Sequence, residues 1–347
     1  MISAEQIQEA LKSVKYPGFN RDIVSFGLVK DIRLDGANIE VRIAIATADP
    51  KIPQAIHSAA MARLQALPGA GKVEVKIDIQ APPAAPAAAT GPARIEGVRH
   101  IIAVASGKGG VGKSTVASNL AVALQRSGAR VGLCDCDLYG PSIALMFGAH
   151  ERPTADDENR IIPIERYGVK LMSMGFLLDD DSPAVLRGPM VTRYTQQFLR
   201  QVAWGDLDYL LLDLPPGTGD IQLTIVQTVA LTGTIIVTTP QEVALIDARK
   251  AARMFAKTNV PVLGIVENMS YFQCPSDGVQ YDLFGRGGGG REAARLGVPL
   301  LGELPIDIAV REGGDVGRPA AEFAAGTDSG TAFAQMAGVV RKLIETA

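Results

Sequence analysis

The 347-residue chain has little of several things, and its scarcity of cysteine is the most informative. Three cysteines are too few, and odd in number, for a disulfide framework, which favours a reducing compartment. No apolar run reaches the ~18 residues that a membrane span needs, and the first residues lack the basic-then-apolar pattern of a secretory signal. We therefore expect a cytoplasmic protein with no membrane partner.

An excess of positive charge is also missing, since 34 Lys and Arg residues stand against 37 Asp and Glu residues. This balance does not favour a broad electrostatic surface for nucleic acid, and we expect no nucleic-acid partner. Aromatic residues make up only 5% of the chain, whereas hydrophobic residues make up 47%. Small aliphatic residues and glycine suit an α/β protein whose helices pack closely on parallel strands.

A run without charge or large apolar side chains, residues 81–93, predicts a boundary between domains. Its prolines favour an extended linker that buries no core. We predict a small α+β domain over 1–80, a linker over 81–97 and a large domain over 98–347. The expected elements of the small domain are a helix over 4–14, strands over 23–33 and 38–46, a helix over 52–67 and a strand over 72–79.

In the large domain, apolar strands alternate with amphipathic helices. The expected strands are 100–105, 130–135, 169–173, 209–213, 233–238, 262–268 and 300–304, and the expected helices are 112–127, 190–201, 222–231, 245–257 and 290–296. This alternation predicts an α/β fold with a doubly wound, mostly parallel sheet, whose ligand sites lie at the carboxyl ends of the strands.

A glycine-rich loop separates the first strand of the large domain from the helix that follows. Glycines let successive backbone N–H groups point at phosphates, and the start of a helix adds positive potential. Strand, loop and helix form the setting of a P-loop, in which Lys113 contacts the β- and γ-phosphates and Ser114 ligates Mg²⁺. We therefore predict an ATP hydrolase. The predicted ATP-binding residues of this segment are Gly107, Lys108, Gly109, Gly110, Val111, Gly112, Lys113, Ser114 and Thr115.

Two further strands end in carboxylates at the same predicted edge of the sheet. Asp213 follows an apolar strand, the arrangement in which a carboxylate orders Mg²⁺ and its waters. Asp135 and Asp137 follow another strand, and Asp135 is either part of the magnesium shell or structural. Residues 215–219 read Pro-Pro-Gly-Thr-Gly, which we interpret as a loop that senses the γ-phosphate.

Lys108 occupies a position that an ordinary P-loop does not need. The run Lys-Gly-Gly-Val-Gly-Lys-Ser over 108–114 resembles the deviant Walker A motif of the MinD/ParA/nitrogenase iron protein group. The resemblance implies a homodimer in which Lys108 reaches the partner's nucleotide and stabilises charge that develops in the transition state. It implies that Asp137 positions the attacking water, which makes Lys108, Lys113 and Asp137 the catalytic residues. Asn268, at a strand end, is expected to contact the adenine, as in related P-loop ATPases.

Together, five segments resemble the Mrp/ApbC family of iron–sulfur cluster carrier ATPases, and the resemblance covers essentially all of 98–347. The segments are 106–115, 135–142, 187–190, 213–220 and 267–272. The first eighty residues resemble the small domain, of an iron–sulfur assembly type, that many bacterial members carry. The resemblance implies ATP-dependent transfer of a cluster to apoprotein acceptors, with iron–sulfur assembly proteins as further partners.

One departure from the family pattern concerns the cluster ligands. Family members typically carry Cys-x-x-Cys just after the segment that corresponds to 267–272, and a homodimer with two such pairs supplies four ligands to one [4Fe–4S] cluster. Here Cys274 is present, but Asp277 replaces the second cysteine. A carboxylate is a harder donor than a thiolate and should hold a cluster less securely. Three readings stay open: a labile cluster on both residues, a thiol supplied by a target protein, or a lost cluster.

Cys134 and Cys136 are expected to behave as small hydrophobes beside the nucleotide. The glycine-rich segment 285–290 is interpreted as a flexible cover over the cluster region. The alternative function is a positioning ATPase of the MinD/ParA kind without a cluster. Such a protein needs a membrane helix or a basic surface, and residues 332–347 show no strong cationic face. An electron donor like the nitrogenase iron protein needs full thiolate ligation, against which the single Cys274 argues.

Overall fold

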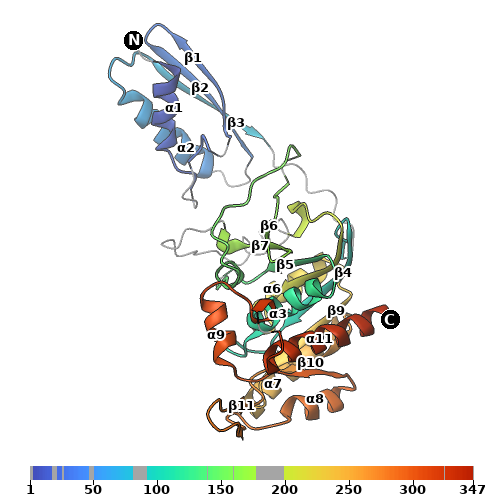
Figure 1. Ribbon diagram of the computed structural model, residues 1–347. Coiled ribbons are helices and arrows are strands. Elements are labelled where there is room, and N and C mark those ends of the chain that lie inside the picture. The colour runs from blue at the N-terminus through green and yellow to red at the C-terminus, as the bar shows by residue number, and fades with distance from the viewer. Residues whose placement is uncertain are drawn as a thin grey trace. The chain divides into compact units, whose positions relative to one another are not determined.

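The computed structural model describes residues 3–17, 22–25, 27–46, 51–80, 92–138, 140–158, 160–176, 199–323 and 325–346. The chain divides into two units, Met1–Ala89 and Thr90–Ala347, and each has its own hydrophobic core (Figure 1). The segment 187–190, most of the expected helix over 190–201 and most of the expected linker lie outside the described residues.

The first unit is a three-stranded sheet with two helices. Its elements are α1 (Ala4–Lys12), β1 (Val29–Asp35), β2 (Asn38–Ala46), α2 (Lys51–Gln65) and β3 (Val73–Gln80). The strand order is β1-β2-β3, with β1 antiparallel and β3 parallel to β2. Alternate residues of β2, among them Val41 and Ile43, are buried in one core with Ile7 of α1 and Ile56 of α2.

The first strand of this unit begins later than the sequence predicts, at Val29 rather than at residue 23. The carboxylate of Asp22 accepts hydrogen bonds from the backbone N–H groups of Val24, at 2.9 Å, and Ser25, at 2.7 Å. Such a side chain imposes a local turn that competes with extended backbone. Ile23 is therefore a buried core residue without being part of the strand.

The second unit is built on an eight-stranded sheet. Its elements are β4 (Val98–Ala105), α3 (Lys113–Arg126), β5 (Val131–Asp135), α4 (Ile143–Met146), β6 (Ile164–Arg166), β7 (Val169–Ser173), η1 (Met174–Phe176), β8 (Leu207–Asp213), α6 (Asp220–Thr228), β9 (Gly233–Thr238), α7 (Glu242–Lys257), β10 (Val262–Glu267), β11 (Phe272–Gln273), β12 (Gln280–Tyr281), α8 (Gly288–Leu296), β13 (Leu300–Glu303), α9 (Ile308–Asp315), α10 (Ala320–Phe323) and α11 (Asp328–Glu345).

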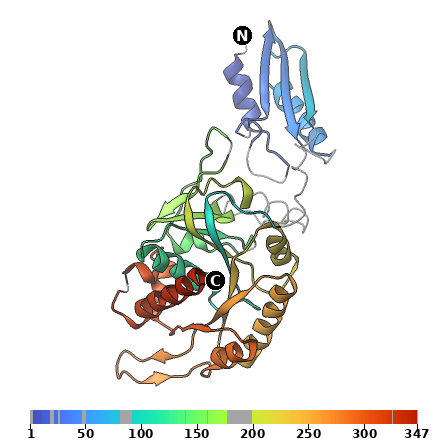
Figure 2. The same ribbon diagram turned by 90° about the vertical axis from the view of Figure 1, so that its right-hand side faces the viewer.

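The order of this sheet is β13-β10-β9-β4-β8-β5-β7-β6, and among its described strands only β6, at the edge, runs antiparallel to its neighbour. Helices α3 and α11 pack on each other on one face, and α7 and α8 pack on each other on the opposite face (Figure 2). The predicted doubly wound, mostly parallel fold is confirmed.

The central strand β4 lies where the order of connections reverses, since β8 is on one side of it and β9 on the other. At such a point a crevice opens beyond the carboxyl end of the strand, and ligands of doubly wound folds bind there. The chain leaves β4 into α3, whose alanine-rich sequence is buried almost all round. A helix of that kind is held rigidly, so the crevice has a fixed floor.

The C-terminal helix α11 belongs to the core of the second unit. Phe333, Met336, Val340 and Ile344 are buried, and the helix packs on α3 and β13. Its apolar face is thus covered by its own domain. Among the residues that the structure describes, no helix combines the length and the apolar character needed to cross a bilayer.

Candidate nucleotide site and cysteine hairpin

Residues 107–112, here called the phosphate loop, run from the end of β4 into α3. Gly112, the N-cap of α3, has a φ of 79°, in the left-handed region that favours glycine. A Cβ at Gly112 would overlap Nδ2 of Asn268, and a Cβ at Gly107 would overlap the backbone carbonyl of Asp247 in α7. Close packing on both sides therefore fixes the path of the loop.

Lys113, the first residue of α3, and Asp213, at the end of β8, form a buried ion pair. Lys113 Nζ lies 2.5 Å from Asp213 Oδ1 and 3.2 Å from Ser114 Oγ, and the two charged side chains are 6% and 0% exposed. Asp213 Oδ2 is buried without a hydrogen-bond partner among the described residues. Burial raises the pKa of Asp213, and the nearby Lys113 acts in the opposite direction. One oxygen thus has an internal cation, and the other has no hydrogen-bond partner in the described part of the chain.

Asp135 is the register partner of Asp213 on β5, but its surroundings differ. Within the described residues it accepts hydrogen bonds from the backbone N–H groups of Asp137, Ser142 and Ile143, at 3.0, 2.9 and 3.1 Å, and from the hydroxyl of Ser173, at 3.1 Å. Burial and the Asp213 carboxylate raise the pKa of Asp135 to about 7, against the effect of the N–H donors. Both oxygens of Asp135 therefore hold the chain that follows β5, and its predicted place in the magnesium shell stays a prediction.

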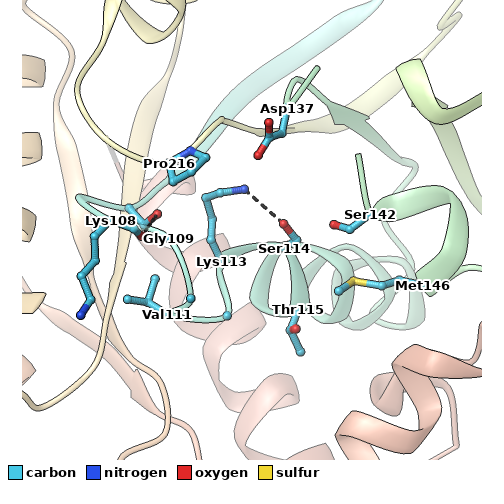
Figure 3. Close-up of a pocket in the computed structure, with 13 residues that line it drawn as sticks. Lys108, Gly109, Val111, Lys113, Ser114, Thr115, Asp137, Ser142, Met146 and Pro216 are labelled. Atoms are coloured by element: carbon cyan, nitrogen blue, oxygen red, sulfur yellow. Dashed lines mark hydrogen bonds between the residues drawn. The ribbon is translucent and has the colours of Figure 1, made fainter. Parts of the chain in front are cut away.

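A pocket of about 240 Å³ opens over the phosphate loop. Lys113, Ser114 and Asp137 come together at it (Figure 3). The lining consists of Ser106, Lys108, Gly109, Gly110, Val111, Gly112, Lys113, Ser114, Thr115, Asp137, Ser142, Met146 and Pro216. The sequence predicts the loop, Asp137 and the segment of Pro216, and the family segment 135–142 ends at Ser142. No motif includes Met146, which lies in the short helix α4.

The ammonium group of Lys108 is directed away from Lys113 and Asp137 (Figure 3). The side chain is half-buried, and within the described part of the chain no hydrogen bond or ion pair involves its ammonium group. The hydroxyl of Ser106 donates to the Lys108 carbonyl at 3.0 Å, which fixes the backbone instead. A contact of Lys108 with a second copy's nucleotide stays a prediction.

Asn268, immediately after β10, is hydrogen-bonded to the phosphate loop. Its Nδ2 donates to the carbonyl oxygen of Val111 at 2.9 Å, and the residue is 9% exposed. The side chain is not part of the pocket lining. Asn268 is therefore a loop support in this structure, and its predicted contact with adenine stays a prediction.

The segment Pro215-Pro216-Gly217, after β8, is also tied to the site. Gly217 donates its N–H to the Ser106 carbonyl at 3.0 Å, and the buried Gln222 donates its Nε2 to the Pro215 carbonyl at 2.5 Å. Gln222 was not predicted as a site residue. A signal was available, because a glutamine stands where α6 otherwise buries Ile225 and Val226.

Cys274 lies in residues 272–281, here called the cysteine hairpin, which consists of β11, β12 and the turn between them. Its Sγ lies 3.0 Å from the hydroxyl oxygen of Ser276. In the same turn, the Asp277 carboxylate accepts the N–H of Val279 at 2.9 Å, and this bond, together with one from the Cys274 side chain, lowers the pKa of Asp277. The structure thus brings the two residues of the departing motif together.

The other two cysteines are separate from this hairpin. Cys134 and Cys136 are 1% and 4% exposed, and their sulfur atoms are 3.9 Å apart at the end of β5. Among the residues with a described placement, no group of three or more His, Cys, Asp or Glu side chains could hold a metal ion within one copy. Cys274 is therefore the accessible thiol of the protein.

These features define a class. The central strand of a mostly parallel sheet leads into a glycine loop and a buried helix, and Lys113 pairs with Asp213 of the adjacent strand. This arrangement is that of a P-loop nucleotide-binding domain. Residues 97–341 match the family described as NUBPL iron-transfer P-loop NTPase, and residues 4–90 match the family of iron–sulfur cluster assembly proteins. The chain therefore belongs to the iron-transfer P-loop NTPase family, as its motifs predict.

The relatives cover most of the chain. An iron–sulfur cluster carrier protein of Deinococcus radiodurans is 48% identical over 319 residues, which are 91% of this chain and 88% of the relative. The iron–sulfur cluster transfer protein NUBPL of Mus musculus is 49% identical over 252 residues, which are 72% of this chain and 79% of the relative.

Solved structures resemble the second unit. A nucleotide-binding protein of Archaeoglobus fulgidus in complex with ADP is 43% identical with a TM-score of 0.59, covering 65% of this chain and 89% of that one. The septum site-determining protein MinD of Pyrococcus horikoshii with Mg-ADP is 25% identical with a TM-score of 0.56, covering 70% of this chain and 96% of that one.

Proposed function

We propose that this protein is an ATP-dependent iron–sulfur cluster carrier of the cytoplasm, which hydrolyses ATP as a homodimer and transfers clusters to apoproteins. The observation that carries the proposal is the buried Lys113–Asp213 pair under a glycine loop, in a chain whose relatives are named as cluster carrier and transfer proteins. Iron–sulfur assembly proteins that supply clusters are the further partners of this proposal.

Nucleotide binding starts from the phosphate loop and Lys113. Backbone N–H groups of residues 109–115 and the positive start of α3 hold the phosphates. Lys113 already lies in the pocket with its charge neutralised by Asp213. Bound phosphates compete with Asp213 for the same ammonium group, so nucleotide binding frees a second oxygen of that carboxylate.

The donors beside Lys113 fit a magnesium ion. Asp213 Oδ2 is buried without a partner in the described part of the chain, and Ser114 Oγ is adjacent to Lys113. Both are hard oxygen donors of the kind that Mg²⁺ prefers. Ser114 and Asp213 would hold the ion directly or through its waters, and the ion neutralises phosphate charge when it is bound.

Hydrolysis requires a water molecule in line with the γ-phosphate. Asp137 lines the pocket and can accept a hydrogen bond from that water, which orients it. The ammonium group of Lys108, which is directed away from Lys113 and Asp137, is free to approach the nucleotide of a second copy. A cation added there stabilises charge in the transition state, so hydrolysis depends on the dimer.

The cargo is a cluster held between two cysteine hairpins. Two copies supply two Cys274 thiolates and two Asp277 carboxylates, which could ligate one [4Fe–4S] cluster. Because carboxylates bind soft iron centres less firmly than thiolates, such a cluster is released readily. This property suits a carrier better than an electron-transfer protein.

Anaerobic reconstitution with iron and sulfide tests the cargo. We expect iron-dependent absorbance in the wild type, its loss in Cys274→Ala, and tighter retention in Asp277→Cys. Ser276→Ala is the matched control, since it removes a neighbour of the thiol at 3.0 Å and leaves both ligands. A wild type that takes up no iron would contradict the carrier proposal, whatever its ATPase activity.

The alternative is a positioning ATPase without a cluster. The likeness to MinD with Mg-ADP supports the nucleotide chemistry of both functions. The apolar face of α11 is occupied in the core, so the membrane helix that this alternative needs receives no support from the C-terminal segment. ATP-dependent sedimentation with liposomes or DNA would favour the alternative.

A further inference from the structure

One buried carboxylate holds both ends of the chain segment that carries the cysteine hairpin. Glu267, at the end of β10, is 0% exposed. Its Oε1 accepts a hydrogen bond from the hydroxyl of Ser270 at 2.6 Å, just before the hairpin, and from the N–H of Gly287 at 3.2 Å, just after it. Its Oε2 accepts the N–H of Gly289 in the first turn of α8.

The contact at α8 depends on glycine. A Cβ at Gly289 would approach the Cβ of Glu267 to 2.8 Å, which a real side chain does not tolerate. The glycine-rich segment before α8 is therefore not only a flexible cover, as the sequence suggests, since Gly287 and Gly289 hold the carboxylate. Without these donors the buried carboxylate would have unsatisfied oxygens, which costs free energy. The position of Glu267 and the positions of the chain segments before and after the hairpin therefore depend on each other.

The next residue along the chain holds the phosphate loop. Asn268 donates to the Val111 carbonyl at 2.9 Å. That carbonyl and the N–H of Gly112 belong to one planar peptide unit, so the two groups cannot reorient independently. A phosphate that attracts the Gly112 N–H therefore turns the carbonyl that Asn268 holds.

The chain from Asn268 to Ser270 is stiff. Met269 has a φ of 55°, an uncommon left-handed conformation for a residue with a side chain. Its neighbours are tied to the sheet, because Asn268 donates its N–H to the Thr238 carbonyl at 2.8 Å and Ser270 donates its N–H to the Leu304 carbonyl at 2.9 Å. A stiff connection transmits a displacement instead of absorbing it.

We propose that Glu267 and Asn268 form a direct mechanical link through which the nucleotide state of the phosphate loop sets the geometry and reactivity of the cysteine hairpin. The inference deepens the proposed function, because it names how ATP would control cargo. Asn268 connects to the nucleotide through one peptide plane, and Glu267 connects to both ends of the hairpin segment. Both are positioning residues, since neither contacts the cargo.

The reactivity of Cys274 reports on this link without any cluster. Cys134 and Cys136 are buried, so a maleimide or a disulfide reagent added to the reduced, metal-free protein labels Cys274 first. The labelling rate is measured without nucleotide, with Mg-ADP and with Mg²⁺ plus a non-hydrolysable ATP analogue, all at saturation as checked with a fluorescent nucleotide. We expect nucleotide to change the wild-type rate by about fivefold, the effect of one hydrogen bond made or lost.

Variants of the two residues should separate the link from general stability. In Asn268→Ala, Cys274 should be labelled at the same rate without nucleotide and with saturating nucleotide. Glu267→Gln should label about tenfold faster than the wild type without nucleotide and no longer respond, because a charged acceptor of three donors is lost. Ser270→Ala removes only one of those donors and takes the place of Glu267→Gln if that variant does not fold.

The matched control is Arg249→Gln. It cuts a different tie to α8, the bond from Arg249 Nε to Glu292 at 2.8 Å, and leaves Glu267 and the Val111 carbonyl untouched. We expect it to keep the nucleotide response. A wild type without a response, an Asn268→Ala protein that keeps one, or an Arg249→Gln protein that loses one would each overturn the link. A response without iron uptake on reconstitution would contradict the carrier function and leave the link standing.

Discussion

Removal of the ammonium group of Lys113 tests whether an internal ion pair holds the nucleotide-free site together. In Lys113→Met, Asp213 would stay fully buried and lose the cation 2.5 Å from its Oδ1, while its Oδ2 has no partner among the described residues. Breaking a buried pair in this way destabilises by about 3–5 kcal/mol. The penalty has a ceiling, because the carboxyl can instead take up a proton, which from its ordinary pKa of 3.8 costs about 4 kcal/mol at pH 7.

We therefore expect the free energy of unfolding of Lys113→Met to be about 3–4 kcal/mol below that of the wild type at pH 7. The pH dependence gives a second check. Without Lys113 the pKa of Asp213 rises further, so the native variant keeps a proton that the unfolded chain loses above its ordinary pKa. The penalty should shrink as pH falls below 7, by at most about 1.4 kcal/mol for each pH unit, until the wild-type carboxyl, whose pKa burial also raises, takes up a proton as well.

Urea denaturation followed by the fluorescence of Trp204 measures this energy, because Trp204 is the only tryptophan and is 1% exposed in the same unit. The double variant Lys113→Met/Asp213→Asn should recover about 2 kcal/mol or more, since the buried charge is then absent. Lys250→Met is the control: it breaks an exposed pair with Asp247 and should change the energy by less than about 1 kcal/mol. A Lys113→Met penalty no larger than the control's, or no recovery in the double variant, would refute the reasoning.

Three further predictions concern the loop, the buried carboxylate and the cargo. Gly112→Ala should lower nucleotide affinity at least tenfold in a fluorescent-nucleotide titration, because the φ of 79° and the overlap of the new Cβ with Asn268 both oppose alanine. Gly128→Ala is the control: this glycine has a φ of 90° but open space around it, so the substitution should leave nucleotide affinity unchanged. Because the pKa of Asp135 is raised to about 7, the native state binds an extra proton between about pH 4 and pH 7, so the free energy of unfolding should fall as pH rises through this window. Asp135→Asn should flatten that slope in denaturation curves, and an unchanged slope would assign it to other groups. Asp277→Cys should slow the transfer of iron from reconstituted protein to a chelator relative to the wild type, and equal rates would exclude the carboxylate as a ligand.

The residues that meet around Lys113 were largely predictable because parallel strands end at one edge of a sheet. Lys113 follows β4, Asp213 ends β8 and Asp137 follows β5, and these three strands are neighbours in the order of the sheet. Strand-ending residues therefore converge once the parallel pattern is known. The same pattern predicted the fold, since every described strand of the large sheet except β6 is parallel to its neighbours.

The division of labour between Asp135 and Asp213 was not predictable from the same pattern. Both carboxylates end adjacent strands in register. One of the donors to Asp135 is the hydroxyl of Ser173, 38 residues away, which no local motif announces. Asp213 instead meets Lys113, 100 residues away. Roles that depend on such distant donors appear only when the chain is folded.

The two adjacent residues at the end of β10 show the same limit. The strand-end position of Asn268 led to an expected contact with adenine, but its amide is occupied by the Val111 carbonyl, 157 residues away. Glu267 received no role from the sequence, although an acidic residue that ends an apolar strand is itself unusual. Its burial requires donors, and those donors are the hydroxyl of Ser270 and the N–H groups of Gly287 and Gly289.

The site separates into a part that is prepared and a part that has to move. Gly107 and Gly112 are packed against α7 and Asn268, and Asp135 is fully hydrogen-bonded, so the cradle for phosphates exists before nucleotide arrives. Lys113 is instead paired with Asp213, and the ammonium group of Lys108 is directed away from Lys113 and Asp137. Preorganised N–H groups reduce the entropy lost on binding, whereas the exchange of one anionic partner for another keeps the charge of Lys113 compensated. The ammonium group of Lys113 therefore has an anionic partner with and without nucleotide, and a bound Mg²⁺ would take its place beside the Asp213 carboxylate.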